Sequence, residues 1–430
     1  MRRIGAIGAL AVLVLLPPGS GDRPLTLHAQ PAATAKLLGI VGDNGGSRVA
    51  ELDPVTLAPL RASPLVGYVD AWVRSPDGAS IAFATSTRTT VPDRKLRFLD
   101  PSSLQWSPQA VDLDGGLSGA LWASSDRIVA LVYLGNGIAS VETIDTAAGK
   151  VVARQPVLHV ISVVRRSADG LVALGGPKTG LGPARLVVVG ADAQARTVTL
   201  RRISMGTRWR WSRSTPVGTM RQPGLAVDAA GAVAYVVDAG GLVARVDLRD
   251  LSVTYHLPAK PLAARLAAWL TAPAEAKMVS GPVRTADWLG DGVLAVSGMD
   301  YFASRKRVSS TPAGLRVIDT RDWMVRTIDP QAGSFVIAEG LLLATGTRYH
   351  SNTTGTSTVS TGEGVAAYGP DGRLRWRVDA GTSRGVVTAY GSAALTWRSG
   401  DDPYQVIDLS SGRTVRTGAS YTTLLLGPGS

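Results

Sequence analysis

The sequence contains no cysteine among its 430 residues. This absence excludes disulfide bonds, thiolate metal ligands, a thiol nucleophile and a lipid-modified N-terminal cysteine. Histidine is almost as scarce, with four residues in the chain, so a catalytic triad or a zinc site has few candidate members. Stability must therefore come from a hydrophobic core, and any chemistry must use residues other than thiols.

Long apolar runs are also missing, except at the N-terminus. Arg2 and Arg3 precede a mostly apolar run from Ile4 to Leu16, and Pro17 ends it. The run is too short to span a bilayer, and its positive start is typical of a secretory signal. We expect residues 1–35 to form a signal peptide that is cleaved near "ATA" at 33–35, and the mature chain to be extracytoplasmic, either secreted or associated with the cell envelope.

Acidic residues are fewer than basic ones, and the net charge is +12 with a pI near 10.2. Such a charge favours an anionic partner. However, only seven of the 45 basic residues are lysine, and a strong skew to arginine, with abundant Ala, Gly and Val, is typical of a GC-rich bacterial genome. Local clusters of charge are therefore more informative than the total.

Helical periodicity is almost absent, and one phrase recurs instead: an alternating apolar run, an Asp or Gly, a short turn and a second alternating run. Alternation with period two predicts strands, and an Asp at the turn can accept backbone N–H groups. The copies are "VAELDPVTL" (49–57), "LRFLDPSSL" (96–104), "VETIDTAAGK" (141–150), "LVVVGADAQAR" (186–196), "VARVDLRDL" (243–251), "LRVIDTRDW" (315–323), "VAAYGPDGRL" (365–374) and "YQVIDLSSGR" (404–413).

A second pair of apolar runs precedes most copies, as in "DAWVRSPDGASIAFAT" (70–85). Four strands per unit, repeated at roughly 50-residue intervals, are typical of the blades of a β-propeller. We predict an all-β fold, a single domain over 36–430 with eight four-stranded blades, or seven if 159–203 is not a blade. The first unit lacks its inner strand, so the C-terminal run "YTTLLLG" (421–427) is expected to supply it and close the ring.

These motifs carry a resemblance to known proteins. "SPDGASIAFAT" (75–85), "LAVDAAGAVAYVVDAGGLVARVDLRDLSV" (225–253) and "YQVIDLSSGRTV" (404–415) resemble the repeats of bacterial YVTN/WD40-like propellers. "GPDGRLRWRVDAG" (369–381) is similar to a repeat of the PQQ-type quinoproteins. The quinoprotein docking pattern is not repeated and the adjacent cysteines of many such enzymes are missing, so the resemblance implies the fold, and we expect no cofactor.

The long connections are predicted to gather on one face of the ring. In a four-stranded blade, the second-to-third and blade-to-blade connections share a face, and here the extra residues fall in that set, at 86–95, 204–222, 258–281, 299–314 and 347–362. Connections longer than a turn requires are often functional. One of them carries helical spacing and predicts a helical insertion at about 260–278, which we expect to cover this face through its apolar side.

The same face receives "TRWRWSR" (207–213), which lies within the densest positive segment of the chain, from Ala193 to Val227. Arginine with tryptophan suits an anionic polymer or a membrane surface, because guanidinium groups pair with phosphate or carboxylate and indole stacks. The alternative is that the two tryptophans only pack on a blade beneath arginine side chains. The candidate binding residues are Arg208, Trp209, Arg210, Trp211, Arg213, Asp300, Tyr301, Arg305, Lys306, Arg307, Arg348, Tyr349 and His350.

Catalytic candidates are few. Asp70, Asp228 and Asp287 fall on inner strands and could line the channel, where facing carboxylates would permit acid–base chemistry. Tryptophans recur beside them, at 72, 122 and 288, which favours packing between blades instead. His159 and His256 are expected to pack, His350 has only Asp300 as a possible partner, and no ligand cluster predicts a metal site.

The sequence thus predicts a non-enzymatic binding or scaffold propeller at the cell envelope, monomeric, with an anionic polymer, a membrane surface or another envelope protein as partner. Nucleic acid is not the expected partner. The alternative is a lactonase-like or glycan-acting hydrolase that uses carboxylates at the channel mouth.

Overall fold

The computed structural model describes residues 37–43, 46–86, 94–135, 138–157, 160–212, 215–258, 279–303, 307–352, 358–398, 404–418 and 422–426. Within these ranges every regular element is a β-strand, as the alternating pattern predicts. The predicted signal peptide at 1–35 and the predicted helix at 260–278 lie outside the described residues.

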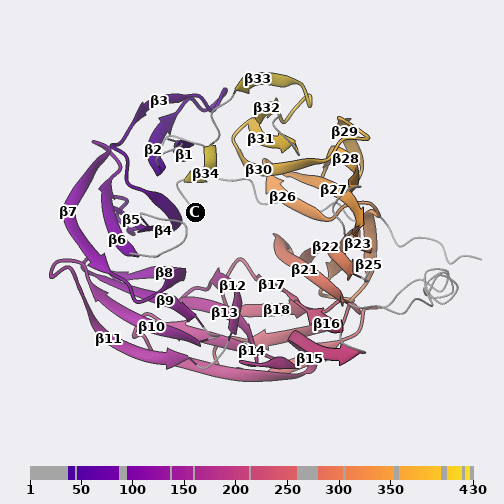
Figure 1. Ribbon diagram of the computed structural model, residues 1–430, viewed down its shortest axis with the longest axis horizontal. Helices are drawn as coiled ribbons and strands as arrows, with labels where there is room; N and C mark the ends of the chain where they lie inside the picture. The colour runs from indigo at the N-terminus through magenta and orange to yellow at the C-terminus, as the bar shows by residue number, and fades with distance from the viewer. Residues whose placement is uncertain are drawn as a thin grey trace, which may run out of the picture.

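Five sheets have four strands each, and their strands follow one another in space as antiparallel neighbours. Figure 1 places these sheets one after another around a common centre. Their strands are β1 (Leu38–Asp43), β2 (Gly46–Leu52), β3 (Pro59–Ala62) and β34 (Thr422–Leu426); β4 (Tyr68–Arg74), β5 (Ile81–Ser86), β6 (Lys95–Asp100) and β7 (Gln105–Asp112); β8 (Gly116–Ser124), β9 (Arg127–Gly135), β10 (Ile138–Asp145) and β11 (Lys150–Val157); β17 (Gly224–Val227), β18 (Val233–Val237), β19 (Val243–Asp247) and β20 (Val253–His256); and β30 (Arg384–Tyr390), β31 (Ala393–Arg398), β32 (Tyr404–Asp408) and β33 (Thr414–Gly418).

The sixth sheet has fourteen strands. It contains residues 160–203, from the segment that the sequence left open as a blade, in the consecutive neighbours β12 to β15. Its strands are β12 (Val160–Arg166), β13 (Gly170–Gly176), β14 (Gly180–Gly190), β15 (Ala195–Ser212) and β16 (Thr215–Arg221); β21 (Val279–Gly290), β22 (Val293–Ala303), β23 (Arg307–Pro312), β24 (Leu315–Asp319) and β25 (Val325–Asp329); and β26 (Ser334–Ala338), β27 (Leu341–Asn352), β28 (Thr358–Tyr368) and β29 (Leu374–Val378).

The C-terminal strand β34 completes the first sheet. It pairs antiparallel with β1, and Leu38 lies opposite Leu426 while Ile40 lies opposite Leu424. The sheet order is therefore β3-β2-β1-β34, with the first and last strands of the described chain side by side.

The core lies between successive sheets. One buried cluster joins Ala82 and Leu96 of the sheet β4–β7 to Ile128 and Ala130 of the next sheet. Alternate residues of the same strand point to opposite sides of a sheet, so β9 contributes its other residues, such as Leu131, to the cluster shared with the following sheet. Each sheet is thus buried on both faces, which explains the apolar composition of the middle strands.

The recurrent Asp turns have the predicted structure. Asp53 Oδ1 accepts hydrogen bonds from the backbone N–H groups of Val55 (3.0 Å) and Thr56 (2.7 Å). The residue four positions after the Asp has a positive φ, 52° at Leu57 and 59° at Leu104. Both leucines are almost fully buried, so packing offsets the cost of a left-handed backbone at a residue with a Cβ.

Candidate functional site

Most of the described long connections are paired strands and not loops, which corrects the sequence-based expectation. β15 continues past the body of its sheet to Ser212 and turns back as β16. β16 pairs parallel with the start of β21, because Gly218 lies opposite Val279 and Thr219 opposite Ser280. The end of β22 pairs with β23, and β23 pairs in turn with the end of β27.

These pairings produce one continuous strip of sheet, and Figure 1 shows its strands β15, β16, β21, β22, β23 and β27 along one side of the ring. We call this strip the added sheet and define it as residues 206–212, 215–221, 279–283, 299–303, 307–312, 347–352 and 358–362. Three segments that are far apart in the sequence are therefore joined by backbone hydrogen bonds.

The added sheet brings most of the predicted binding residues together. Arg208, Trp209, Arg210 and Trp211 lie in β15, with backbone partners in β16 from Thr219 to Pro216. Asp300 and Tyr301 lie in β22, Arg307 begins β23, and Arg348, Tyr349 and His350 lie in β27. Arg213, Arg305 and Lys306 lie outside the described residues. Whether Trp209 and Trp211 serve in binding or in packing stays a prediction.

The register places the charged residues and the two tyrosines on opposite sides of the added sheet. Directly opposed residues share a side of a sheet and alternate residues take opposite sides. Phe302 lies opposite Ser309, which lies opposite His350, so His350 and Asp300 share one side. Ser280 lies opposite Phe302 on one side and opposite Thr219 on the other. Thr219 in turn lies opposite Arg208, so Arg208 shares this side of the sheet.

We call this side the cationic face, and its described charged residues are Arg208, Arg221, Asp300, Arg348 and His350. Tyr301 and Tyr349 both lie opposite Ser310 and so occupy the other side. Arg208, Arg221 and Arg348 are exposed, whereas Asp300 is held in an ion pair of 2.8 Å with Arg284 of β21. The cationic face therefore presents three exposed arginines.

A cleft lies beneath the cationic face, against the turn between β18 and β19. Arg221 and Pro282 line it from the added sheet, and Asp238 and Gly240 line it from the turn. An adjoining cavity shares Asp238 and is bordered by Arg284 and Arg316. Partial burial, together with the neighbouring Arg284, lowers the pKa of Arg316.

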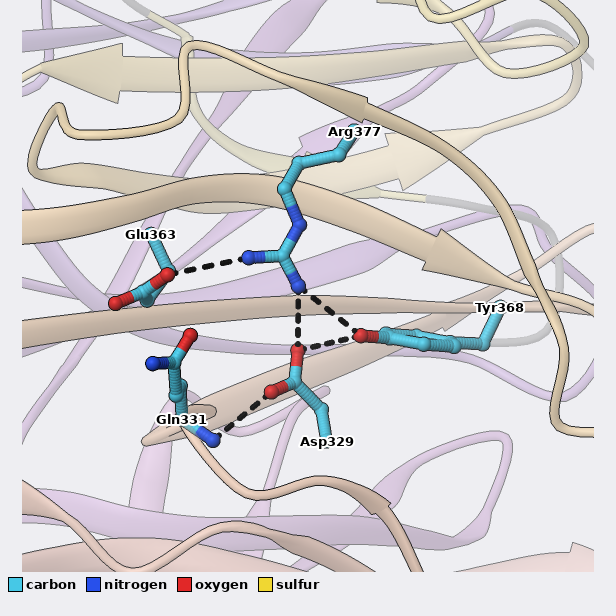
Figure 2. A network of polar contacts seen from close by, with 5 residues as sticks. All are labelled: Asp329, Gln331, Glu363, Tyr368 and Arg377. Carbon is cyan, nitrogen blue, oxygen red and sulfur yellow. Dashed lines mark hydrogen bonds and ion pairs between the residues drawn. The ribbon is translucent and has the colours of Figure 1, made fainter.

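A buried polar network fixes β28 close to where it enters the added sheet (Figure 2). The Tyr368 hydroxyl donates to Asp329 Oδ2 at 2.6 Å, and Arg377 Nη2 donates to the same oxygen at 3.3 Å. Arg377 Nη1 also donates to Glu363 Oε2 at 3.1 Å. The Gln331 side-chain amide, oriented with its nitrogen toward Glu363, donates to Glu363 Oε2 at 2.7 Å.

This network raises the pKa of Tyr368 to about 12, because the hydroxyl is buried and donates to the carboxylate of Asp329. Asp329 is the last residue of β25, while Tyr368 and Arg377 come from β28 and β29. The network therefore connects two neighbouring four-strand units, and we interpret it as a structural support of the added sheet.

The channel carboxylates do not form a facing cluster among the described side chains. Asp228 Oδ1 accepts the backbone N–H groups of Ala232 (2.8 Å) and Val233 (3.0 Å), as a turn residue does. Burial raises the pKa of Asp287, and the positive charge of Arg165 partly offsets this effect. The side chain of Asp70 lies outside the described part of the chain.

The tryptophans beside these positions pack between units, as predicted. Trp122 Nε1 donates to the carbonyl of Val73 in the preceding sheet at 3.3 Å, and Trp288 stacks on Tyr235 with ring centroids 5.4 Å apart. Trp72 packs against a cluster shared with β1 and β2.

Histidine chemistry has little support in the described residues. His256 stacks on Trp323 at 3.7 Å between ring centroids, which agrees with the predicted packing role, and His159 lies outside the described ranges. Among the described residues no group of three His, Asp or Glu is placed to hold a metal ion. The same part of the chain has no helix with the length and apolarity needed to cross a membrane.

Arg284 and Arg316, which border the cavity, could not be found from the sequence. Each is a single arginine in an ordinary strand, with no local cluster to mark it. Their proximity depends on the pairing of β22 with both β21 and β24.

No protein-family model and no curated protein matches this sequence. Among solved structures, the chain is similar to dihydro-heme d1 dehydrogenase NirN in complex with DHE, with a TM-score of 0.52, 14% identity, and coverage of 96% of this chain and 78% of that chain. It is also similar to the periplasmic gluconolactonase PpgL of Pseudomonas aeruginosa (TM-score 0.46, 14% identity, 81% and 96% covered). A third similar structure is BamB from Moraxella catarrhalis (TM-score 0.43, 11% identity, 81% and 90% covered).

At such identities a structural likeness concerns the fold alone. The likeness to NirN and the sheets arranged around a centre define the chain as an all-β protein of the β-propeller type. The class carries many unrelated functions, so function must be argued from the site.

Proposed function

We propose that this protein is an exported, eight-bladed propeller, closed by β34, that acts as a non-enzymatic binding or scaffold module at the cell envelope. The N-terminal apolar run behind Arg2 and Arg3 supports export. The expected partner is an anionic polymer, which the cationic face engages. A membrane surface or an anionic envelope protein is the alternative partner.

The observation that carries this proposal is the separation of charge on the added sheet. Arg208 and Arg221 lie at one end, on β15 and β16, and Arg348 lies on β27. Five strand-to-strand steps separate β15 from β27, which is about 24 Å at the usual spacing of neighbouring strands. An extended polyanion can contact both ends together, whereas a small anion can contact only one.

The alternative function is a lactonase-like or glycan-acting hydrolase at the channel mouth. Asp287 favours it, because a buried carboxyl with a raised pKa is typical of a general acid. Such a mechanism needs a second, facing carboxylate, and Asp228 is occupied by its own turn. We therefore prefer the binding function, and Asp287→Asn tested against lactone and glycan substrates addresses the alternative.

The experiment measures binding of the purified protein to polyphosphate of increasing chain length, and to anionic liposomes, across a salt series. A triple variant changes Arg208, Arg221 and Arg348 to Gln. We expect polyphosphate binding that weakens with salt, a sharp gain in affinity once the polymer exceeds about 24 Å, and a salt slope reduced by about 2 to 3 in the triple variant.

The matched control removes the same charge from the Asp turns at the opposite ends of the strands, where Arg249, Arg373 and Arg413 are also exposed. Changing these three to Gln should leave the salt slope near the wild-type value. Equal losses in the two triple variants would mean that only net charge matters. No binding to any polyanion would remove the proposal.

A further inference from the structure

The cavity beside β22 has apolar walls and one charged border. It holds about 40 Å³, which is room for about three atoms of the size of a water oxygen. Its apolar lining residues are Val237, Pro258, Val296, Ala313, Ile318 and Val325. A cavity of this size takes an end group of a ligand and not the whole ligand.

The charged border consists of Asp238 and two arginines, and the two arginines differ in their contacts. The Arg284 side chain is 11% exposed and is held by Asp300 and by the carbonyls of Val283 (3.1 Å) and Met299 (3.2 Å). Arg316 donates one long hydrogen bond, 3.4 Å from Nη2 to the carbonyl of Ala313. Most N–H groups of Arg316 therefore have no partner among the described residues and are available to a ligand.

Arg316 is the residue at this border that can receive an anion, because Arg284 is already paired with Asp300. Desolvation and the neighbouring Arg284 lower the pKa of Arg316, and the negative charge of Asp300 partly offsets this effect. A carboxylate placed on Arg316 would accept bidentate hydrogen bonds from its guanidinium group. The end group that fits both the size and the charge is a carboxylate next to a small apolar group.

The adjoining cleft indicates which chemical groups the rest of the ligand carries. It holds about 330 Å³, is open to solvent, and shares Asp238 and Ala239 with the cavity. Asp238 stands at the junction, where its Oδ1 accepts the backbone N–H of Leu242 at 2.8 Å, and Ser204, Thr219 and Gln222 line the cleft further on. Hydroxyl and amide side chains of this kind can pair with the N–H and C=O groups of an extended polypeptide.

We propose that the cavity and the cleft together bind the C-terminal end of a protein or peptide whose last residue is small and apolar. The terminal carboxylate contacts Arg316, the last side chain fills the cavity, and the preceding residues lie in the cleft beneath the cationic face. This inference rests on the alternative partner of the proposed function, an envelope protein, and names the part of that protein that the cleft would recognise.

The test uses the purified full chain and the synthetic hexapeptide GSGSAV, with either a free C-terminal carboxylate or a C-terminal amide. Affinities are measured by fluorescence anisotropy of an N-terminally labelled peptide. We expect the free acid to bind at least about tenfold more tightly than the amide, since a charge-assisted contact is lost. Arg316→Gln should abolish this preference, and Ala313→Leu, which fills the cavity, should weaken the free acid by a similar factor.

The matched control is Arg321→Gln, because Arg321 lies in the same strand pair, on the exposed turn after β24, and pairs with Asp319. This variant should keep the preference for the free acid. Equal affinity for acid and amide, the same preference in Arg316→Gln, or no peptide binding would overturn the inference. Polyphosphate binding measured on the same variants distinguishes the two proposals, since Arg316→Gln should retain it even where peptide recognition fails.

Discussion

The hydroxyl of Tyr368 provides a quantitative test of the network in Figure 2. Tyr368→Phe keeps the ring but removes the 2.6 Å hydrogen bond to Asp329, which is 3% exposed and cannot recover the bond from water. Loss of a hydrogen bond to a buried charged group costs about 1.5 to 3 kcal/mol. For a chain of this length, that cost corresponds to a fall in Tm of about 2 to 4 °C.

The pH dependence gives an independent measure of the same interaction. The folded pKa of Tyr368 is about 12, above the ordinary value of 10, so the hydroxyl contributes its full stabilisation below pH 10. This contribution is lost as the pH rises from 10 to 12, and about 1.4 kcal/mol of it should be gone at pH 11. The stability gap between the wild type and Tyr368→Phe should therefore narrow at alkaline pH.

The assay is thermal unfolding of both proteins at pH 7, 9 and 11. Tyr235→Phe is the matched control, because Tyr235 is 5% exposed and its hydroxyl has no hydrogen bond within the described part of the chain. We expect this control to stay within about 0.5 kcal/mol of the wild type at pH 7. A Tyr368→Phe protein as stable as the wild type at pH 7, or a gap that does not narrow by pH 11, would refute the reasoning.

Three further outcomes are expected from local structure. Gly412 has a φ of +72°, and a Cβ added there would lie 2.9 Å from the Trp376 ring. Gly391 has a φ of +51°, and a Cβ added there would meet open space. Gly412→Ala should therefore lower Tm more than Gly391→Ala does. Burial raises the pKa of Glu142, so its ionisation costs stability as the pH rises, and Glu142→Gln should become more stable relative to the wild type between pH 4 and pH 7 in thermal unfolding. Burial lowers the pKa of His256, so the stability that the neutral imidazole contributes is lost as the pH falls below 6.5. His256→Phe should therefore reduce the fall in Tm between pH 7.5 and pH 5.5. An unchanged fall in Tm would contradict this.

Much of the fold could be predicted because its signals are local. An Asp followed by turn residues needs only the N–H groups of its own turn, as Asp53 and Asp100 demonstrate. The apolar runs of the middle strands depend only on the two buried faces of the sheet. The role of the terminal run at 421–427 could be inferred because the first unit lacks a strand, and β34 does pair with β1.

The added sheet could not be predicted in the same way. Alternation in "TRWRWSR" was visible, but the partner strands were not. β16 pairs with β21, although the four strands of the sheet β17–β20 lie between them in the sequence. β23 pairs with β27, although a hairpin and a further strand lie between them in the sequence. Such pairings depend on the placement of whole four-strand units, so the sequence indicated the face but not the register that separates Arg208 from Tyr301.

The pairing changes what the arginines can do as a binding surface. An arginine on a mobile loop loses backbone freedom when it binds, and this cost reduces the affinity. Arg208 and Arg348 instead lie on strands whose backbones are already paired on the added sheet. The sheet is supported by the Arg284–Asp300 ion pair at β21 and β22 and by the Tyr368 network at β28. Because the supports fix the spacing of the charges before binding, the surface should select partners by the spacing of their negative groups as well as by their total charge.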